Sequence, residues 1–401
     1  MMIVLAKPEF RSKTFLRSHM QEIINFYTPI CINEAYGGYY NAFRDDGSIY
    51  DRETQHLVST TRFIFNYCTA FKVFGRQEYL AAAQHGIDYL IGKHLDLQHS
   101  GYFWVMKNDQ PSDTTKTCYG HAFVLLAFAA AAKAGIAGAK ERVEETYQLL
   151  ESRFWNENDR MYVDEINRDW SQVSNYRGQN ANMHMTEAML AAYEATGDTK
   201  FLDRAETLAF KVCAELAEKA GGLVWEHYHE DWSIDWLYNK DDPHNLFKPF
   251  GFLPGHMTEW TKLLLLLERY RPRDWILPKA VQLYEAALAR AADLENGGLH
   301  YSFGPDGKLY DLDKYHWVHC ETLAAAAALA VRTGLERYWQ DYDRLWAYSW
   351  RHFIDHEYGC WFRVLSPDGK KHDDKKSPPG KTDYHPFGAC YEIFRILEHA
   401  K

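Results

Sequence analysis

Cysteine is scarce in this sequence and follows no pattern. The 401 residues include 7 cysteines, scattered between Cys31 and Cys390, and none of them forms a C-x-x-C pair. An odd number of cysteines at irregular spacing argues against a disulfide framework and against a structural zinc site. This usage is typical of a reducing compartment, and we expect a cytoplasmic protein.

Long apolar runs and long basic runs are missing as well. The longest apolar stretches, such as FVLLAFAAAA from Phe123, are too short for a membrane span of about 20 residues. The opening residues MMIVLAKPEF fall short of the roughly 7–15 apolar residues of a secretory segment. The formal charge of -10, without a lysine- and arginine-rich run, disfavours a surface for phosphates. We therefore expect neither a membrane nor a nucleic acid as partner, and the oligomeric state stays open.

Linkers are missing too, while aromatic residues are plentiful. No proline- or serine-rich stretch divides the chain, and phenylalanine, tryptophan and tyrosine make up 15% of it. Such a composition provides for a large hydrophobic core. We expect one domain that spans residues 1–401.

A phrase of glycines and aromatic residues recurs along the chain, each time followed by a turn and a helix. The six copies are GGYYNAFRDDGSIYD from Gly37, SGYFWVMKNDQPSD from Ser100, DRMYVDEINRDW from Asp159, GGLVWEHYHEDW from Gly221, GGLHYSFGPDGKLYD from Gly297 and YGCWFRVLSPDGKKHD from Tyr358. Their starting positions are roughly 60–75 residues apart, which leaves room for more than a minimal helix pair in each repeat. Alternating residues and Asp-Gly turns predict a short β-hairpin in the phrases.

The segments between the phrases predict two kinds of helix. Some are apolar nearly all round and should be buried, such as HAFVLLAFAAAAKAG from His121 and ETLAAAAALAV from Glu321. Others are amphipathic and charged, such as KERVEETYQLLESRFW from Lys140. With a first helix near residues 9–27 and a last one near 385–399, about twelve helices alternate. The pattern predicts an all-α fold, an (α/α)6 barrel of six inner and six outer helices, with short β-hairpins at the cavity mouth.

Histidines recur with the same period as the phrases. The six positions are His56, His121, His184, His256, His319 and His385. They are about 63–72 residues apart, and each falls near the start of a buried helix, so we expect them at one mouth of the central cavity. Two of them begin the repeated tetrapeptide HMTE, which places a histidine and a glutamate on one face of a helix.

Three chemistries suit such a rim. Paired H-x-x-E motifs can bind metal, but Arg62 at the rim would be unfavourable beside a cation, so we expect no metal and no other cofactor.

Glycoside hydrolysis needs two carboxylates, yet histidines recur at the rim, and the carboxylates are better placed to hydrogen-bond these histidines. The carboxylates available for hydrolysis would be Glu226, Glu259, Glu321 and Asp383. Proton transfer beside a sugar carbonyl needs an imidazole, a cation for the enediolate oxygen and an aromatic wall, and histidine, Arg62 and Trp317 meet these needs.

Several of these segments also resemble a known family. YRGQNANMHMTEAMLAAYEATGD from Tyr176 resembles the N-x-x-M-H-x-x-E-A signature of the N-acylglucosamine 2-epimerase superfamily, and FGFLPGHMTEW from Phe250 resembles its G-H-x-x-E-W motif. KTDYHPFGACYEIFR from Lys381 is similar to its terminal segment. YNKDDPHNLFKPFG from Tyr238 is similar to the aldose–ketose isomerase branch. The resemblance runs the whole length of the chain.

The resemblance implies an (α/α)6 barrel that works without metal and removes a proton at C2 of a sugar through an enediolate. It implies that His256 and His385 are the catalytic residues. The positions that it implies for substrate binding are Arg62, Tyr119, Asn180, His184, Glu226, Glu259, Trp317 and Glu321.

Individual roles follow for some of these residues. We expect His385 to move a proton between C2 and C1, and His256 to open the sugar ring and handle protons at O1 and O2. Glu259 should orient His256 or bind hydroxyls. Arg62 should donate to the enediolate oxygen, and Trp317 should pack against the sugar.

The expected function is interconversion of D-mannose and D-fructose, with a monosaccharide as partner. A sugar 2-epimerase acting on mannose and glucose or on N-acylglucosamine, and a sulfoquinovose isomerase, remain as alternatives. Asn180 and His184 would bind hydroxyls in either case, whereas a sulfonate would need further donors such as Lys248 or His244. A glycoside hydrolase and a sugar-binding protein without catalysis are further alternatives.

Overall fold

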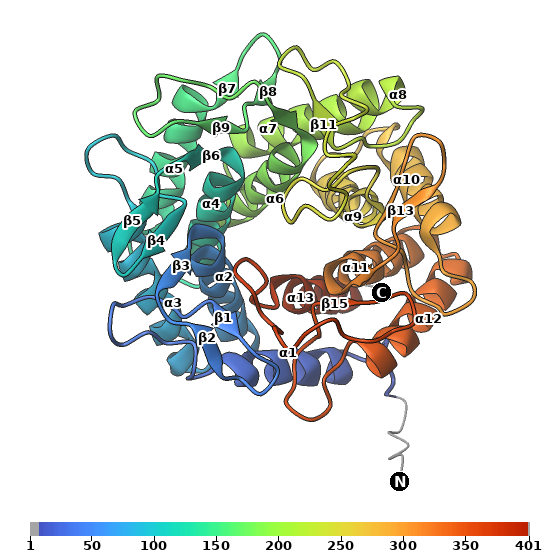
Figure 1. Ribbon diagram of the computed structural model, residues 1–401, viewed down its shortest axis with the longest axis horizontal. Helices are drawn as coiled ribbons and strands as arrows, with labels where there is room; N and C mark the ends of the chain where they lie inside the picture. The colour runs from blue at the N-terminus through green and yellow to red at the C-terminus, as the bar shows by residue number, and fades with distance from the viewer. Residues whose placement is uncertain (1–7, 400–401) are drawn as a thin grey trace.

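The computed structural model describes residues 8–399, and two concentric rings of helices dominate it (Figure 1). The inner ring consists of α2 (Leu57–Phe74), α4 (Cys118–Lys133), α6 (Gln179–Thr196), α9 (Pro254–Tyr270), α11 (His316–Thr333) and α13 (Tyr384–His399). The outer ring consists of α1 (Lys13–Tyr27), α3 (Gln77–Tyr89), α5 (Ala139–Arg153), α7 (Thr199–Phe210), α10 (Ile276–Ala291) and α12 (Glu336–His352). The π-helix η1 (Leu90–His94) extends α3, and η2 (Lys211–Leu216) with α8 (Ala217–Lys219) extends α7. The predicted (α/α)6 barrel is confirmed. The opening residues considered for a secretory segment include 1–7, which lie outside the described range.

The two rings differ in sequence as their surroundings require. The alanines of α11 from Ala324 to Ala328 are all buried, because small side chains let this helix be covered on every side. The outer helix α12 instead buries a single face through Tyr338, Tyr342, Leu345 and Trp346, which recur at the spacing of helical turns. The hydrophobic core therefore lies between the rings and inside the inner one.

Helix ends are set by residues that the sequence marks clearly. The Thr117 hydroxyl accepts a hydrogen bond from the Gly120 backbone N–H at 3.2 Å and so begins α4. Gly197 ends α6 with a φ of 77°, in the left-handed region where glycine carries no steric penalty. These caps fix which residues of each inner helix lie in its first turns.

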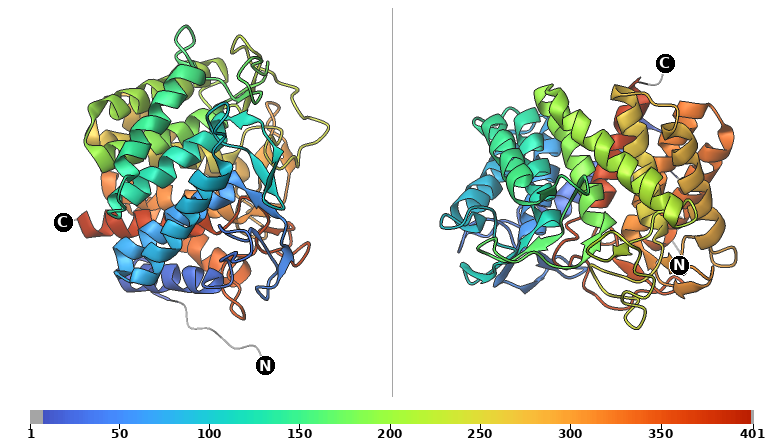
Figure 2. Two further views of the ribbon diagram at one scale, coloured as in Figure 1. Left: turned by 90° about the vertical axis from the view of Figure 1, so that its left-hand side faces the viewer. Right: turned by 90° about the horizontal axis from the view of Figure 1, so that it is seen from above.

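Short strands gather at one end of the barrel (Figure 2). They are β1 (Ala42–Phe43), β2 (Ile49–Asp51), β3 (Thr54–His56), β4 (Val105–Lys107), β5 (Gln110–Asp113), β6 (Lys116–Thr117), β7 (Trp155–Asn156), β8 (Met161–Tyr162), β9 (Glu165–Ile166), β10 (Arg177–Gly178), β11 (His227–Tyr228), β12 (Ser302–Phe303), β13 (Leu309–Asp311), β14 (Lys314–Tyr315) and β15 (Val364–Leu365). Antiparallel hairpins join β1 to β2, β4 to β5 and β12 to β13 within three of the recurring phrases, as predicted, and another joins β7 to β8. In the other three phrases a single bridge spans the turn, from Ile166 to Val173, Tyr228 to Ile234 and Leu365 to Lys371.

Strand contacts also join each repeat to the next one around the ring. Within residues 8–399, four of these junctions are the antiparallel pairs β3–β4, β6–β9, β10–β11 and β14–β15. Two further junctions are the single bridges Phe252 to Phe303 and Phe43 to Ser377. The last bridge joins the end of the chain to its beginning, and α1 packs against α13 in the same region. The ring is closed in this way, and its strands hold the beginnings of the inner helices at one mouth.

The described residues include no helix that is long and apolar enough to cross a membrane. All seven cysteines are buried and none forms a disulfide within the described part of the chain. Both findings agree with the scarcity and spacing seen in the sequence.

Candidate active site

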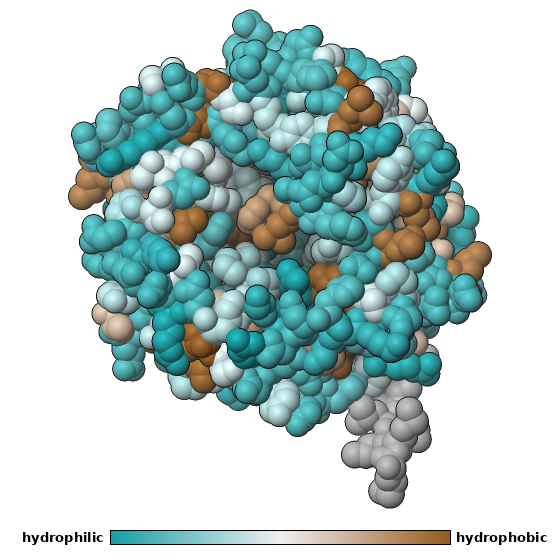
Figure 3. All heavy atoms as spheres, viewed as in Figure 1, coloured by the Kyte–Doolittle hydropathy of each residue, from teal (hydrophilic) through white to brown (hydrophobic). Residues whose placement is uncertain are grey.

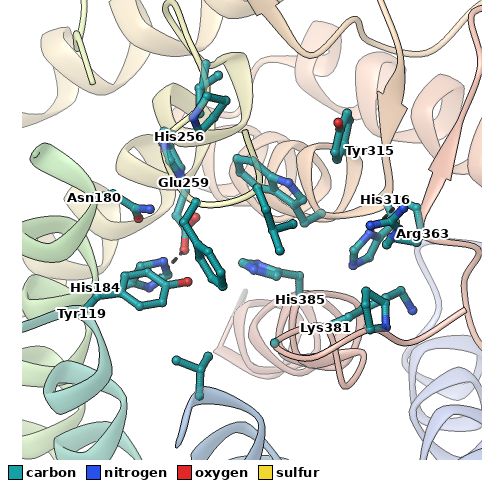
Figure 4. Close-up of a pocket in the computed structure, with 18 of the residues that line it drawn as sticks. Tyr119, Asn180, His184, His256, Glu259, Tyr315, His316, Arg363, Lys381 and His385 are labelled. Atoms are coloured by element: carbon teal, nitrogen blue, oxygen red, sulfur yellow. Dashed lines mark hydrogen bonds and ion pairs between the residues drawn. The ribbon is translucent and has the colours of Figure 1, made fainter. Parts of the chain in front are cut away.

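A cavity of about 850 Å³, counted with its open part, lies at the strand end of the barrel. The space-filling view shows a hollow at the centre of this face (Figure 3). The first turns of all six inner helices contribute to its lining, with Val58 and Arg62 from α2, Tyr119 from α4, Asn180 and His184 from α6, His256 and Glu259 from α9, His316 and Trp317 from α11, and His385 from α13. Figure 4 shows several of these side chains directed toward a common space.

His385 is held by a buried carboxylate. Its Nδ1 lies 2.7 Å from Oε1 of Glu321, so Nδ1–H donates to the carboxylate and Nε2 is left without a proton. Burial, followed by the positive charge of Arg62, holds the pKa of His385 well below its ordinary value of 6.5. The imidazole is therefore neutral at pH 7 and can accept a proton.

His256 is held in a similar way, through a longer chain of hydrogen bonds. Its Nδ1 lies 2.9 Å from Oε2 of Glu226, and the amide of Gln179 donates to the same oxygen at 2.9 Å. The Trp260 indole N–H donates to the Gln179 amide oxygen at 2.7 Å, which fixes the orientation of this amide. Glu226, and not Glu259, therefore orients His256. The expectation that Glu259 orients this ring is wrong, because its carboxyl points elsewhere on the helix face.

Trp317 lies between these two histidines. Its ring centroid is 4.9 Å from that of His256 and 5.7 Å from that of His385. The backbone of Gly255 approaches the same indole so closely that a Cβ there would lie 2.4 Å from a ring carbon. A glycine at this position of α9 is what lets Trp317 form a wall between the two imidazoles.

Arg62 is fixed by contacts on several sides. Its guanidinium carbon lies 4.4 Å from the ring centroid of Phe123 and 4.7 Å from that of Tyr384. The guanidinium donates to the Gly380 carbonyl and, at 3.1 Å, to the Tyr119 hydroxyl. A positive charge is therefore presented to the cavity in one orientation.

Helices α6 and α9 supply further polar groups to the lining. Nδ1 of His184 lies 3.0 Å from Glu187, the glutamate of its own HMTE sequence, and burial lowers the pKa of His184 to about 4. Among the described residues, Oδ1 of Asn180 and both carboxyl oxygens of Glu259 are buried without a hydrogen-bond partner. Burial, and then the charge of Glu321, holds the pKa of Glu259 well above its usual range. These atoms are available to hydrogen-bond a polar ligand.

The arrangement of the carboxylates does not suit hydrolysis. Of the four carboxylates considered for that reaction, Glu259 alone belongs to the cavity lining within residues 8–399. Glu226 and Glu321 are bonded to the two histidines, and Asp383 accepts hydrogen bonds from Tyr27 at 2.5 Å and from Lys381 at 2.7 Å. A glycosidase needs two carboxyl groups facing its substrate, and this cavity offers one.

Two groups of side chains have the spacing that a metal ion would require. They are His184 with Glu187 and Glu259, and Glu259 with Glu321 and His385, each with ligand atoms within 4.8 Å of one another. However, Nζ of Lys262 lies among the same carboxylates, 2.5 Å from Glu321, 3.7 Å from Glu259 and 3.8 Å from Glu187. This ammonium already supplies the positive charge that a metal would bring, and it would repel a second cation.

The structure brings eight of the ten predicted site residues into one lining. Glu226 and Glu321, which were expected to contact the sugar, do not line the cavity and instead lie behind His256 and His385. Sequence reasoning missed His316, Lys262 and Gln179. Lys262 could have been found, because a lysine stands out in the otherwise apolar helix EWTKLLLLL.

Three of the six recurring histidines line the cavity, and the other three were expected only as rim or scaffold residues. Of these three, His121 and His319 do not line it. Nε2 of His121 accepts the backbone N–H of Tyr102 at 3.0 Å, and Nε2 of His319 accepts that of Leu299 at 3.1 Å. They differ in helical phase from the lining residues, since each residue turns a side chain by about 100°. These two histidines anchor the loops that precede the hairpins.

His56 does not line the cavity either. Its Nδ1 accepts the backbone N–H of Val58 at 3.2 Å, so the ring caps α2.

The donors considered for a sulfonate, Lys248 and His244, form ion pairs outside the cavity lining. Lys248 pairs with Glu165 and His244 pairs with Asp311, each at 2.8 Å, outside the lining.

The double ring of helices and its cavity of carboxylate-backed histidines, an arginine and a tryptophan define an (α/α)6-barrel protein with a candidate acid–base site. Within this class, the chain belongs to the N-acylglucosamine 2-epimerase family, whose model matches residues 38–389.

The chain is similar to curated relatives along nearly its whole length. It is 49% identical over 394 residues to a D-mannose isomerase of Marinomonas mediterranea, covering 98% of this chain and all of the relative. It is 34% identical to a D-mannose isomerase of Pseudomonas cannabina pv. alisalensis, covering 92% of this chain and 89% of the relative.

The fold of this chain is also similar to that of solved structures. A crystal structure of D-mannose isomerase matches with a TM-score of 0.95 at 49% identity, covering 97% of this chain and all of the other. A cellobiose 2-epimerase from Spirochaeta thermophila, 24% identical, shares the fold with a TM-score of 0.84 over 96% of this chain and 98% of the other.

Proposed function

We propose that the protein interconverts D-mannose and D-fructose by metal-independent acid–base catalysis through an enediolate. The observation that carries this proposal is the pair of histidines on either side of Trp317, each with its Nδ1 bonded to a buried carboxylate. The similarity to D-mannose isomerases at 49% and 34% identity supports the choice of sugar.

In this proposal His385 is the base at carbon. Nε2 takes the proton from C2 of the open-chain aldose and returns it to C1, while Glu321 stabilises the imidazolium that forms in between. Because a single imidazole on one face performs both transfers, the product is the ketose.

His256 and Arg62 act at the oxygens. His256 moves protons at O1 and O2 and opens the sugar ring, and Glu226 keeps its Nδ1 protonated so that Nε2 faces the sugar. Arg62 donates to the oxygen on which negative charge develops, where a fixed cation in a dry cavity is most effective. Tyr119, Asn180, His184 and Glu259 then bind the hydroxyls.

A sugar 2-epimerase is the second candidate. One observation favours it: His184 supplies a third imidazole to the same cavity. If a second base delivered the proton back to C2 from the opposite face, the product would be the epimer and not the ketose.

Incubation with D-mannose in D₂O, followed by NMR, tests the proposal. We expect fructose that carries deuterium at C1, in the share of turnovers during which the imidazolium exchanges its proton. Glucose with deuterium at C2 would identify an epimerase instead. Tight binding of mannose without any product or label would identify a sugar-binding protein.

Removal of divalent metal ions is expected to leave the activity unchanged, because the Lys262 ammonium lies where the carboxylates would otherwise gather a metal. The measurement is the initial rate after dialysis against EDTA, compared with untreated enzyme and with added magnesium, manganese or zinc. A loss on chelation that one of these ions restores would contradict the metal-independent mechanism.

We also propose that the protein works as one domain in the cytoplasm. A single core cluster that includes residues of all six inner helices supports the first point. Seven buried cysteines without a disulfide support a reducing compartment.

A further inference from the structure

A second cavity lies on the other side of the catalytic histidine. It has a volume of about 640 Å³ and is lined mostly by later turns of the inner helices. His385 belongs to the lining of both cavities, so this ring separates the sugar site from the rear cavity. The rear side of His385 is strongly charged, with Lys133, Glu187, Glu194, Lys262, Glu321, Glu392 and Arg395 in the lining.

Lys262 is the cation nearest to the catalytic histidines in this charged region. Its Nζ donates to Oε2 of Glu321 at 2.5 Å, while Oε1 of the same carboxylate accepts the Nδ1–H of His385. It also lies 3.8 Å from Glu187, the partner of His184. A single ammonium thus contacts the carboxylates behind two of the cavity imidazoles.

Removal of this cation would change how Glu321 holds His385. Burial raises the pKa of Glu321, and the Lys262 ammonium opposes this effect. Without the ammonium, Glu321 would tend to take up a proton and would no longer be a purely accepting partner for Nδ1–H. A buried carboxylate that loses its counter-ion carries a large penalty unless it neutralises in this way.

We propose that Lys262 is a positioning residue of the isomerisation, which holds Glu321 ionised and directed at Nδ1 of His385 and so keeps Nε2 of that ring as the base. The proposal rests on the proposed function, in which His385 is the base at carbon. Lys262 does not line the sugar cavity and acts through Glu321.

Lys133 provides a matched control in the same rear cavity. It is 17% exposed, against 12% for Lys262, and pairs with the single carboxylate of Glu194. Glu194 is also bonded to Arg395 and Tyr270 and makes no contact with a histidine. Removing Lys133 therefore tests the cost of deleting a buried lysine without touching His385.

The first experiment compares Lys262→Met with Lys133→Met in steady-state kinetics across pH. For Lys262→Met we expect kcat to fall at least about tenfold with little change in KM, as for removal of one support of a catalytic base. We expect the acid limb of kcat/KM to move to higher pH, because losing Lys262 raises the pKa of Glu321 and His385 regains its Nδ1–H tautomer only where this carboxyl is ionised. Lys133→Met should keep the wild-type kcat and pH profile.

The direction of this shift depends on every charged group near His385. They are Arg62 on α2, His184 and Glu187 on α6, Glu259 and Lys262 on α9, and His316 and Glu321 on α11. In the wild type, burial and Arg62 lower the pKa of His385, so kcat/KM should fall only below pH 6.5. Losing Lys262 raises the pKa of Glu321, and the acid limb of the variant follows the ionisation of this carboxyl to higher pH.

Selective ¹⁵N labelling of histidine provides a readout that needs no substrate. The wild-type His385 should show a protonated Nδ1 and a bare Nε2 near pH 7, and Lys262→Met should shift this ring toward the other tautomer, with a protonated Nε2, wherever Glu321 has taken up a proton. If Lys262→Met does not fold, Lys262→Gln replaces it, since its amide can still donate to Glu321 while the charge is lost.

Two results would overturn the proposal. One is a Lys262 variant whose kcat and acid limb match those of Lys133→Met. The other is a His385 tautomer that stays unchanged in the variant across the pH range. If the wild type proves to convert another sugar, the kinetic comparison is made with that sugar, and the NMR result still decides on Lys262 alone.

Discussion

His385→Asn is expected to lower kcat/KM by about 10²–10⁴-fold, the range typical of a general acid–base residue. The asparagine amide can still donate to Glu321 in the place of Nδ1–H, so the carboxylate keeps a partner and the surroundings are preserved. What is lost is Nε2, the atom proposed to remove the C2 proton. The loss corresponds to about 3–5 kcal/mol of transition-state stabilisation.

His319→Asn is the matched control for this variant. His319 is also fully buried on an inner helix, but its Nε2 accepts the backbone N–H of Leu299 and takes no part in the cavity. We expect the His319→Asn variant to have a lower melting temperature and a kcat of the folded enzyme near the wild-type value. The assay is the initial rate of fructose formation, with circular dichroism to check the fold. Activity of His385→Asn within a few-fold of wild type would remove His385 from its proposed role.

Arg62→Met is expected to lower kcat by about 10²–10³-fold, the usual effect of deleting one preorganised donor to a developing oxyanion. Methionine keeps much of the side-chain length and can pack between the rings of Phe123 and Tyr384, so the loss should be chemical and not structural. KM should change less than kcat, because the enediolate carries more negative charge than the sugar.

Two companion variants separate charge from geometry at this position. Arg62→Lys keeps the positive charge and should recover part of the lost rate. Tyr119→Phe removes only the hydroxyl that accepts from Arg62 at 3.1 Å, and a few-fold effect is expected. An Arg62→Met enzyme that changes KM alone would show that the guanidinium binds substrate without stabilising the enediolate.

The fold was accessible from the sequence because its signals are local and repeated. Six glycine–aromatic phrases and alternating apolar and amphipathic helices define the barrel without knowledge of any long-range contact. The junctions between repeats were not accessible. The pairing of Phe43 with Ser377 joins residues that are far apart in the sequence, and no feature of either segment indicates which other segment it pairs with.

Residues of the site could be predicted from the sequence where a single side chain carries the chemistry. The hydrogen-bond partners of these side chains could not be predicted. The repeated HMTE suggested two equivalent pairs, yet His184 bonds to its own Glu187 whereas His256 bonds to Glu226 on another segment. A spacing of three residues shows only that contact is possible. Which carboxylate forms the hydrogen bond to the histidine depends on the neighbouring segments of the fold, and this information is absent from any one stretch of sequence.

The closure of the ring by its last elements has a consequence for synthesis on the ribosome. The Phe43–Ser377 bridge, the packing of α1 against α13 and the arrival of His385 all depend on residues 377–399, which are translated after the other helices of the barrel. Until these residues emerge, the early helices have an uncovered apolar side and the nascent polypeptide lacks the proposed base. A chain that stops before Tyr384 should therefore be both inactive and prone to aggregate, so that premature termination leaves no partially working enzyme.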